Sequence, residues 1–119
     1  MNEKIKIRCP HYLWVRKMII KNGNFIVYIH TNKVNGKLYV GITSQSADAR
    51  WRQGKGYKHC VAFHRAIEKY GWDGFEHEVF AANLTREEAE NMEKILIAKL
   101  NTQDPEFGYN ISEGGNAPQ

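Results

Sequence analysis

Residues 25–42 read FIVYIHTNKVNGKLYVGI and predict a β-hairpin. Two runs of β-branched and aromatic residues, Phe25–His30 and Leu38–Ile42, flank a polar segment that contains an Asn-Gly pair. Asn-Gly is a strong hairpin-turn signal because both residues tolerate positive φ. We therefore expect two antiparallel strands joined by a tight turn, and the rest of the fold to be built around them.

The alternation of side chains along these strands places two tyrosines on the same, less apolar face. Tyr28 and Tyr39 both fall there, with Gly41 two positions after Tyr39. A glycine at that position would let a ligand approach the backbone closely. Strand tyrosines usually only cover a sheet face, and that interpretation stays open. A tyrosine whose pKa is lowered from about 10 by a nearby cation or metal can also act as a base.

The remaining sequence adds two helices, a third strand and a last helix. A short helix is expected over 47–52, ending by Gly54, and a second from about His59 to Tyr70, where Gly71 supplies a C-cap. Alternation over Phe75–Phe80 predicts a strand. The order of hairpin, helices, strand and helix predicts an α+β fold with a small sheet.

The last helix carries an acidic residue within its apolar stripe. It begins with the capping box formed by Thr85 and Glu88. Its expected inward face consists of Ala89, Met92, Glu93, Leu96, Ile97 and Leu100. An isolated carboxylate there is costly unless it is paired or binds a metal. Three explanations stay open for Glu93: a metal ligand, a salt bridge to an arginine, or a position at the edge of a slightly rotated helix face.

Charge is divided unevenly along the 119 residues, whose net charge is +4. Residues 1–60 hold twelve Lys/Arg against two Asp/Glu, and residues 61–119 hold five against eleven. A basic half suits a polyanionic ligand, although it could equally pair with the acidic half. The length predicts one domain, over 23–115, preceded by a basic extension over 1–22 and followed by a tail over 116–119.

Neither a secreted nor a membrane protein is expected. The two cysteines, Cys9 and Cys60, make no disulfide framework, and no apolar run approaches the ~20 residues of a transmembrane helix. The N-terminus lacks the uncharged stretch of a signal peptide. We therefore expect a cytoplasmic protein.

A basic segment follows the hairpin. Arg50 and Arg52 flank Trp51, and Lys55 and Lys58 come shortly after. A guanidinium matches phosphate geometry bidentately, whereas a lysine acts as a point charge. This segment predicts phosphate contacts, with Trp51 interpreted as a core residue. His59 is expected on the inward face of the following helix, where a lone histidine is more often a core residue than a catalyst.

The ordered set of these residues resembles the GIY-YIG nuclease superfamily. The resemblance covers about Phe25 to Gly115 and rests on Tyr28, Tyr39-Val40-Gly41, Arg50, His59, Glu93 and Gly108-Tyr109-Asn110-Ile111. One departure is that Ile26 stands where the family has its first glycine. That glycine is interpreted as structural, so activity is expected to survive.

The resemblance implies a central three-stranded antiparallel sheet flanked by helices, and hydrolysis of DNA phosphodiesters with one divalent metal. Glu93 would hold Mg²⁺ or Mn²⁺, since a single carboxylate completed by waters and phosphate oxygens suits a hard cation. Tyr28 would deprotonate or orient the attacking water, and Tyr39 would support the nucleophile or the phosphate. Arg50 would bind the scissile phosphate. His59 would hydrogen-bond into the tyrosine pair, and Asn110 would brace the site.

The leading hypothesis is thus a metal-dependent endodeoxyribonuclease of the homing or phage-associated kind, monomeric or homodimeric. The runner-up is a nucleic-acid-binding module without catalysis, which rests on the basic first half. A third hypothesis, a zinc module, would use His59, Cys60, His64 and His77, but the sequence lacks a paired Cys-x₂-Cys.

Overall fold

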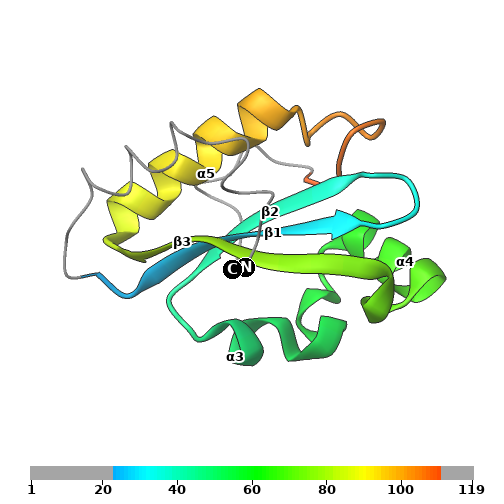
Figure 1. The fold of residues 1–119 in the computed structure, drawn as a ribbon, viewed down its shortest axis with the longest axis horizontal. Helices are drawn as coiled ribbons and strands as arrows, with labels where there is room; N and C mark the ends of the chain where they lie inside the picture. Colours follow the sequence, from blue (N-terminus) through cyan, green and yellow to red (C-terminus); the bar gives the residue numbers. More distant parts are fainter. Residues whose placement is uncertain (1–22, 111–119) are drawn as a thin grey trace.

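The computed structural model describes residues 23–110, which form a three-stranded antiparallel sheet with helices on both faces (Figure 1). The strands are β1 (Phe25–Asn32), β2 (Leu38–Thr43) and β3 (Phe75–Leu84), in the order β2-β1-β3. The helices are α3 (Ala47–Trp51), α4 (Val61–Tyr70) and α5 (Arg86–Leu100), with 3₁₀ turns η1 (Arg52–Tyr57) and η2 (Trp72–Gly74). The predicted α+β class and sheet are confirmed.

The predicted extension over 1–22, the tail over 116–119 and Ile111 lie outside the described residues. Within residues 23–110, no helix is long and apolar enough to cross a membrane.

The hairpin forms as predicted. In its register Tyr28 pairs with Gly41 and His30 with Tyr39. The Oδ1 atom of Asn32 accepts a hydrogen bond from the Val34 N–H at 2.8 Å, which holds the start of the turn. Together these contacts fix which residues of the two strands face each other, and so bring both tyrosines to one face.

Each face of the sheet is covered by its own layer (Figure 1). Helix α5 packs over an aliphatic core that includes Val27, Ile29, Val40 and Ile42. On the opposite face, α3 and α4 cover an aromatic core that includes Tyr28, Tyr39, Tyr57, Phe63 and Phe75. The tyrosine face is therefore a second core, because aromatic residues from η1 and α4 pack onto it.

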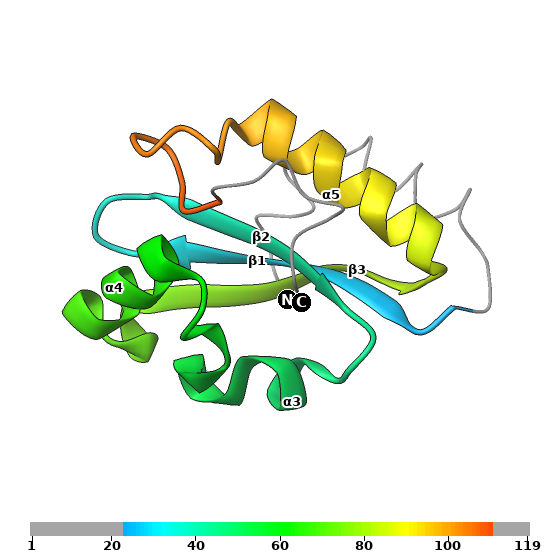
Figure 2. The same ribbon diagram turned by 180° about the vertical axis from the view of Figure 1, so that it is seen from behind.

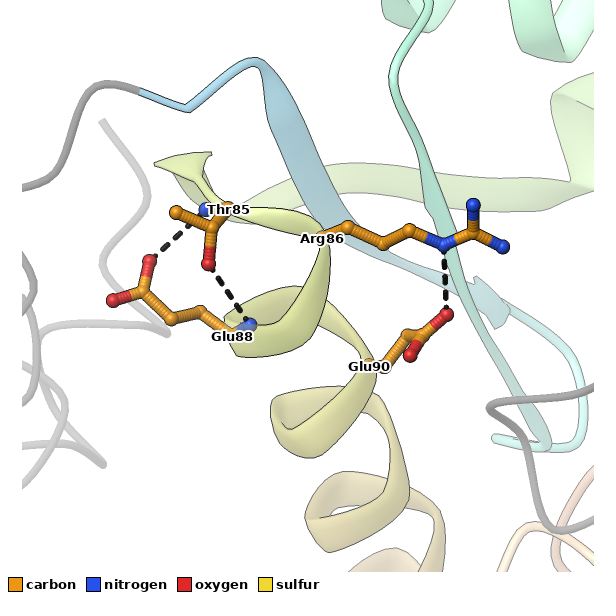
Figure 3. Close-up of polar contacts among 4 residues, drawn as sticks. All are labelled: Thr85, Arg86, Glu88 and Glu90. Carbon is orange, nitrogen blue, oxygen red and sulfur yellow. Dashed lines mark hydrogen bonds and ion pairs between the residues drawn. The ribbon is translucent and has the colours of Figure 1, made fainter.

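Helix α5 begins at the predicted capping box (Figure 3). The Glu88 side chain accepts from the Thr85 N–H at 2.9 Å, and the Thr85 hydroxyl accepts from the Glu88 N–H at 3.2 Å. The buried residues of the helix are Ala89, Glu93 and Ile97. Leu100, predicted to face inward, is exposed at the last turn.

The segment before α4 differs from its prediction. Arg52 and Gln53 adopt positive φ, so α3 ends at Trp51 and the chain enters the turn η1. Helix α4 begins at Val61, and His59 is exposed in the turn before it. The predicted inward position of His59 on the helix is wrong. The C-cap at Gly71 is confirmed, with its N–H bonded to the Ile67 carbonyl.

Strand β3 extends to Leu84, beyond the predicted end at Phe80. Its pairing with β1 shifts register near Val27, and Val79 is partly exposed although the alternation placed it with Phe75 and His77. The register is regular from Phe75 to Val79, and the shift falls between Val79 and Leu84, so it interrupts the two-residue period only in the part of the strand beyond the prediction.

After α5 the chain returns to the free edge of β2 (Figure 2). Leu38 donates its N–H to the Phe107 carbonyl at 3.1 Å and accepts from the Tyr109 N–H at 2.9 Å. The predicted short strand near residue 109 is thus a single parallel bridge, between Leu38 and Gly108. This segment closes the edge beside the tyrosines.

Candidate active site

Tyr28 lies across the hairpin over Gly41. A Cβ atom at Gly41 would come within 2.5 Å of the Tyr28 hydroxyl. The glycine therefore makes room for this tyrosine, and the expectation that it admits a ligand is wrong. The Tyr28 hydroxyl is buried and makes no hydrogen bond of ordinary geometry within residues 23–110.

Arg50 is held beneath the same cluster by the turn that follows it. Its side chain is only 6 % exposed, and Nη1 donates to the Gly56 carbonyl at 2.6 Å. The guanidinium lies 4.4 Å from the centre of the Tyr57 ring, at the distance of a cation–π contact. Gly56 has no room for a side chain, because a Cβ atom would meet the Arg50 carbonyl. The turn η1 thus wraps closely around the arginine.

Arg50 keeps two donors without a protein partner. Its Nε and Nη2 atoms are buried and lack a hydrogen bond in the described part of the chain, as does the hydroxyl of Tyr28. A buried donor without a hydrogen bond costs about 1–3 kcal/mol of folding free energy, and a charged donor costs more. A phosphate oxygen would satisfy a guanidinium of this kind with charge-assisted bonds.

The pKa values of the two tyrosines are governed first by burial. Burial raises the pKa of Tyr28, and the charge of Glu93 adds to this, whereas Arg50 acts in the opposite direction. Burial also raises the pKa of Tyr39 well above 10, with Tyr28 adding to the rise. A lowered tyrosine pKa, which the sequence suggested, is therefore wrong for the protein alone. Both tyrosines are neutral phenols at neutral pH.

Tyr39 is fixed by stacking and a sulfur contact. Its ring stacks on Phe63 with centroids 4.5 Å apart. Its hydroxyl lies 3.7 Å from the sulfur of Cys60, immediately before α4. Tyr39 is thereby anchored to α4, while Tyr28 lies over Gly41.

Glu93 is buried in α5, with 2 % of its surface exposed. This burial rules out the explanation that it lies at the edge of the helix face. Its charge is one of the causes that raise the Tyr28 pKa, so the carboxylate and this tyrosine interact. The charges of Glu93 and Arg50 therefore both act on Tyr28, in opposite directions.

Asn110 braces the edge strand next to Tyr39. Its side-chain carbonyl accepts from the Val40 N–H at 2.9 Å, and its amide donates to the Val40 carbonyl at 2.9 Å. The side chain thus takes the place of a neighbouring strand residue. This geometry agrees with the bracing position expected for Asn110.

The remaining predicted side chains lie at the surface. Arg52, Lys55 and Lys58 are exposed along η1 and the turn after it. His59 is also exposed, and no hydrogen bond joins it to either tyrosine in the described segment. The catalytic role assigned to His59 stays a prediction, without a contact that supports it.

Sequence reasoning missed a buried polar network behind Tyr28. His30 is fully buried and contacts the Tyr57 hydroxyl and the His77 ring, each at 2.8 Å. The available signal was that His30 follows Tyr28 by two residues and so shares its face. Tyr57 gave no signal, since it lies in a glycine-rich turn without periodicity.

The zinc hypothesis is wrong for the part of the chain that the structure describes. Among residues 23–110 no three His, Cys, Asp or Glu side chains gather where they could hold a metal ion. His77 instead contacts His30, and His64 lies 3.3 Å from Glu68 on the same helix.

The fold is that of a small α+β nuclease domain. The model of the GIY-YIG catalytic domain matches residues 24–110, and the chain therefore belongs to this family. Among solved structures, the catalytic domain of the intron endonuclease I-TevI, in a mutant form, is similar with a TM-score of 0.63 and 22 % identity over 76 % of this chain and 96 % of that one. No curated protein matches the sequence. The predicted resemblance is confirmed.

The departure at Ile26 is accommodated by the fold. Ile26 pairs with Thr43 and packs, partly buried, against the aromatic core. Its side chain adds apolar contact on the tyrosine face, and the pairing of β1 with β2 stays in register from Ile26 onward, whereas β1 shifts register against β3 between Phe25 and Val27.

Proposed function

We propose that this nuclease domain is a metal-dependent endonuclease that hydrolyses DNA phosphodiester bonds. The observation that carries the proposal is the pair of buried, unpartnered Arg50 donors beside the unpartnered Tyr28 hydroxyl. An anionic substrate with several acceptor oxygens satisfies these groups together, and a phosphodiester is such a substrate.

In this proposal each side chain acts on one part of the reaction. Arg50 binds the scissile phosphate and stabilises the charge that develops on it. Tyr28 accepts a hydrogen bond from the attacking water and orients it, and Tyr39 supports the phosphate from the same face. Asn110 holds β2 in place beneath Tyr39. His59, from the surface, completes the set predicted from the sequence.

Glu93 fits a hard divalent cation such as Mg²⁺ or Mn²⁺. A buried carboxylate gains from a cation, and water and phosphate oxygens can fill the other ligand positions of a metal that prefers oxygen. When bound, the metal would supply Lewis-acid stabilisation of the leaving oxygen. The charge of Glu93 raises the pKa of Tyr28, which supports a carboxylate acting near this tyrosine.

Exposed basic side chains around η1 would hold the nucleic acid against the site. Arg52, Lys55 and Lys58 lie at the surface within eight positions of the buried Arg50. Each phosphate contact releases counterions, so binding is expected to weaken steeply with salt. A homing or phage-associated role and a cytoplasmic location remain part of the proposal, as does action as a monomer or homodimer.

The test is nicking of supercoiled plasmid DNA with and without Mg²⁺. We expect the wild-type protein to cleave only with the metal, and Glu93→Gln and Tyr28→Phe to lose at least about 100-fold in rate. Glu90→Gln is the matched control, since Glu90 lies one turn earlier on α5 and pairs at its surface with Arg86 at 3.0 Å (Figure 3).

Two outcomes would contradict the proposal. Cleavage at the wild-type rate by both Glu93→Gln and Tyr28→Phe would contradict the metal-binding role of Glu93 and the water-orienting role of Tyr28. Salt-sensitive DNA binding by a wild-type protein that never cleaves would instead favour the binding module without catalysis.

A further inference from the structure

A chain of hydrogen bonds runs through the aromatic core and ends beside Tyr28. It begins at the Trp72 carbonyl, which lies 3.1 Å from His77 Nε2. His77 Nδ1 lies 2.8 Å from His30 Nδ1, and His30 Nε2 lies 2.8 Å from the Tyr57 hydroxyl. Tyr57 lies close enough to Tyr28 for a hydrogen bond between the two phenols, which would lower the pKa of Tyr28 and raise that of Tyr57.

The hydrogen bond between His77 and the Trp72 carbonyl determines which atom is the donor in each of the other hydrogen bonds of the chain. A carbonyl only accepts, so His77 must carry its proton on Nε2. Neutral His77 then accepts at Nδ1, and His30 must donate from its own Nδ1. His30 Nε2 is left as an acceptor and takes the hydroxyl hydrogen of Tyr57.

Both imidazoles are neutral, as this assignment requires. Burial lowers the pKa of His30 well below its usual 6.5, and the nearby His77 and Arg50 lower it further. Burial also lowers the pKa of His77, in the same direction as Lys33 and against the Trp72 carbonyl and Asp73. At neutral pH neither ring carries a second proton, so each nitrogen has one defined role.

The consequence falls on Tyr57, whose single hydroxyl hydrogen is committed to His30. Its oxygen can then only accept hydrogen bonds, and it cannot donate one to its neighbour Tyr28. Tyr28 then receives no hydrogen from Tyr57, in agreement with a hydroxyl that has no hydrogen bond of ordinary geometry in residues 23–110. If the His30 acceptor were removed, the Tyr57 hydrogen could turn toward Tyr28 and occupy those lone pairs.

We propose that His30, fixed by His77, is a positioning residue that points the Tyr57 hydroxyl away from Tyr28 and so keeps Tyr28 free to accept a hydrogen bond from the attacking water. This inference rests on the proposed nuclease function. His30 touches neither the substrate nor the metal in it, and acts through Tyr57. The motif residues that mark the site in the sequence do not include His30, Tyr57 or His77.

The first test is ¹⁵N NMR of the histidine rings in the wild-type protein at neutral pH. We expect His30 to be protonated on Nδ1 and His77 on Nε2. The opposite tautomer at His30, with its proton on Nε2, would overturn the proposal, because Tyr57 would then be free to donate to Tyr28. This measurement depends neither on activity nor on a variant that folds.

The second test compares His30→Phe, Tyr57→Phe and the double variant in single-turnover cleavage with Mg²⁺. Phenylalanine keeps the ring that stacks on Phe63 at 5.4 Å but removes the acceptor. We expect His30→Phe to lower the cleavage rate about 10- to 100-fold with the Kd for DNA unchanged. Tyr57→Phe should stay within about threefold of wild type, since it removes the hydrogen that could be misdirected.

The double variant separates positioning from simple packing. The double variant has no Tyr57 hydroxyl that could turn toward Tyr28, so its cleavage rate should recover to that of Tyr57→Phe. If the two substitutions only disturbed packing, the double variant would cleave more slowly than either single variant. His64→Phe serves as the control, because His64 contacts Glu68 outside the network.

The outcomes distinguish this inference from the proposed function. A wild-type protein that cleaves no DNA overturns the function. An active wild type with an unaffected His30→Phe, or with a double variant as slow as His30→Phe, overturns the positioning role and leaves the function standing.

Discussion

The two faces of the sheet are both buried, yet they differ in chemistry. Against α5 lie small and aliphatic side chains, such as Val27, Val40 and Ile97, with Glu93 the buried acid of the helix. Against α4 lie stacked aromatic rings whose polar atoms join a hydrogen-bond network, with His30 at its centre. Aliphatic packing stabilises the fold without requiring a particular orientation of any atom. The hydrogen-bond network of the aromatic face gives each of its polar atoms a defined orientation.

This difference suggests that the faces divide the work. The aliphatic face should determine how stable the domain is, because apolar burial is non-directional and proportional to area. The aromatic face should determine whether the Tyr28 and Arg50 groups are correctly placed. Apart from Glu93, which the proposed function makes a metal ligand, substitutions on the two faces should therefore separate stability from activity.

The largest expected effect is on the aromatic side. Arg50→Met keeps much of the buried stem but removes the charge, and the cleavage rate should fall about 100- to 1,000-fold because the developing charge on phosphate loses its donor. Single-turnover kinetics would measure it. Arg52→Met at the exposed neighbour is the control and should mainly weaken DNA binding. Equal effects of both variants on the rate would contradict a special role for the buried arginine.

On the aliphatic face, Ile97→Ala should cost about 3 kcal/mol of unfolding free energy, since Ile97 is buried in that core. Urea denaturation would give the loss. Cleavage per folded molecule should stay near wild type, in contrast to Arg50→Met. A large fall in activity without loss of stability would show that the faces do not divide as described.

The brace that Asn110 forms on the edge strand β2 should have an intermediate effect. Asn110→Ala removes both hydrogen bonds to Val40 and leaves its backbone groups unpaired, at a cost of about 2 kcal/mol. Hydrogen exchange should show faster exchange of the Val40 amide. Asn91→Ala, at an exposed position of α5, is the control and should leave that amide protected.

The smallest effect is expected from pH. The folded pKa of His30 lies below its unfolded value of 6.5, so the unfolded chain binds a proton that the folded chain does not. Its stabilising contribution is complete above pH 6.5 and is lost as pH falls below it, by about 1 kcal/mol at pH 5.5. Urea denaturation at pH 7.5 and 5.5 would measure this, and His30→Phe should reduce the difference.

Local patterns in the sequence were sufficient to predict the fold. The Asn-Gly turn, the Thr85 capping box and the C-cap at Gly71 are each set by neighbouring residues, and all three appear in the structure. The end of β3 and the start of α4 were placed less well. A register shift near Val27 and a turn with positive φ at Arg52 depend on tertiary packing, which periodicity does not report.

The site was predictable only where a motif marks it. Tyr28, Arg50 and Glu93 were named from the sequence, and the charges of Glu93 and Arg50 both act on Tyr28. The contacts of His30 with Tyr57 and His77 join residues 27 and 47 positions apart, and no periodicity links them. His59 was expected inward because the helical spacing was extended two residues too far, and α4 begins at Val61.

The bridge between residue 108 and β2 has a consequence for biosynthesis. The Asn110 side chain holds a strand residue, Val40, that precedes it by 70 positions. A nascent chain therefore exposes an open sheet edge until the ribosome has released this segment. Assembly of the tyrosine face is thereby coupled to near-complete translation of the domain, because its edge closes only when residues 108–110 reach β2.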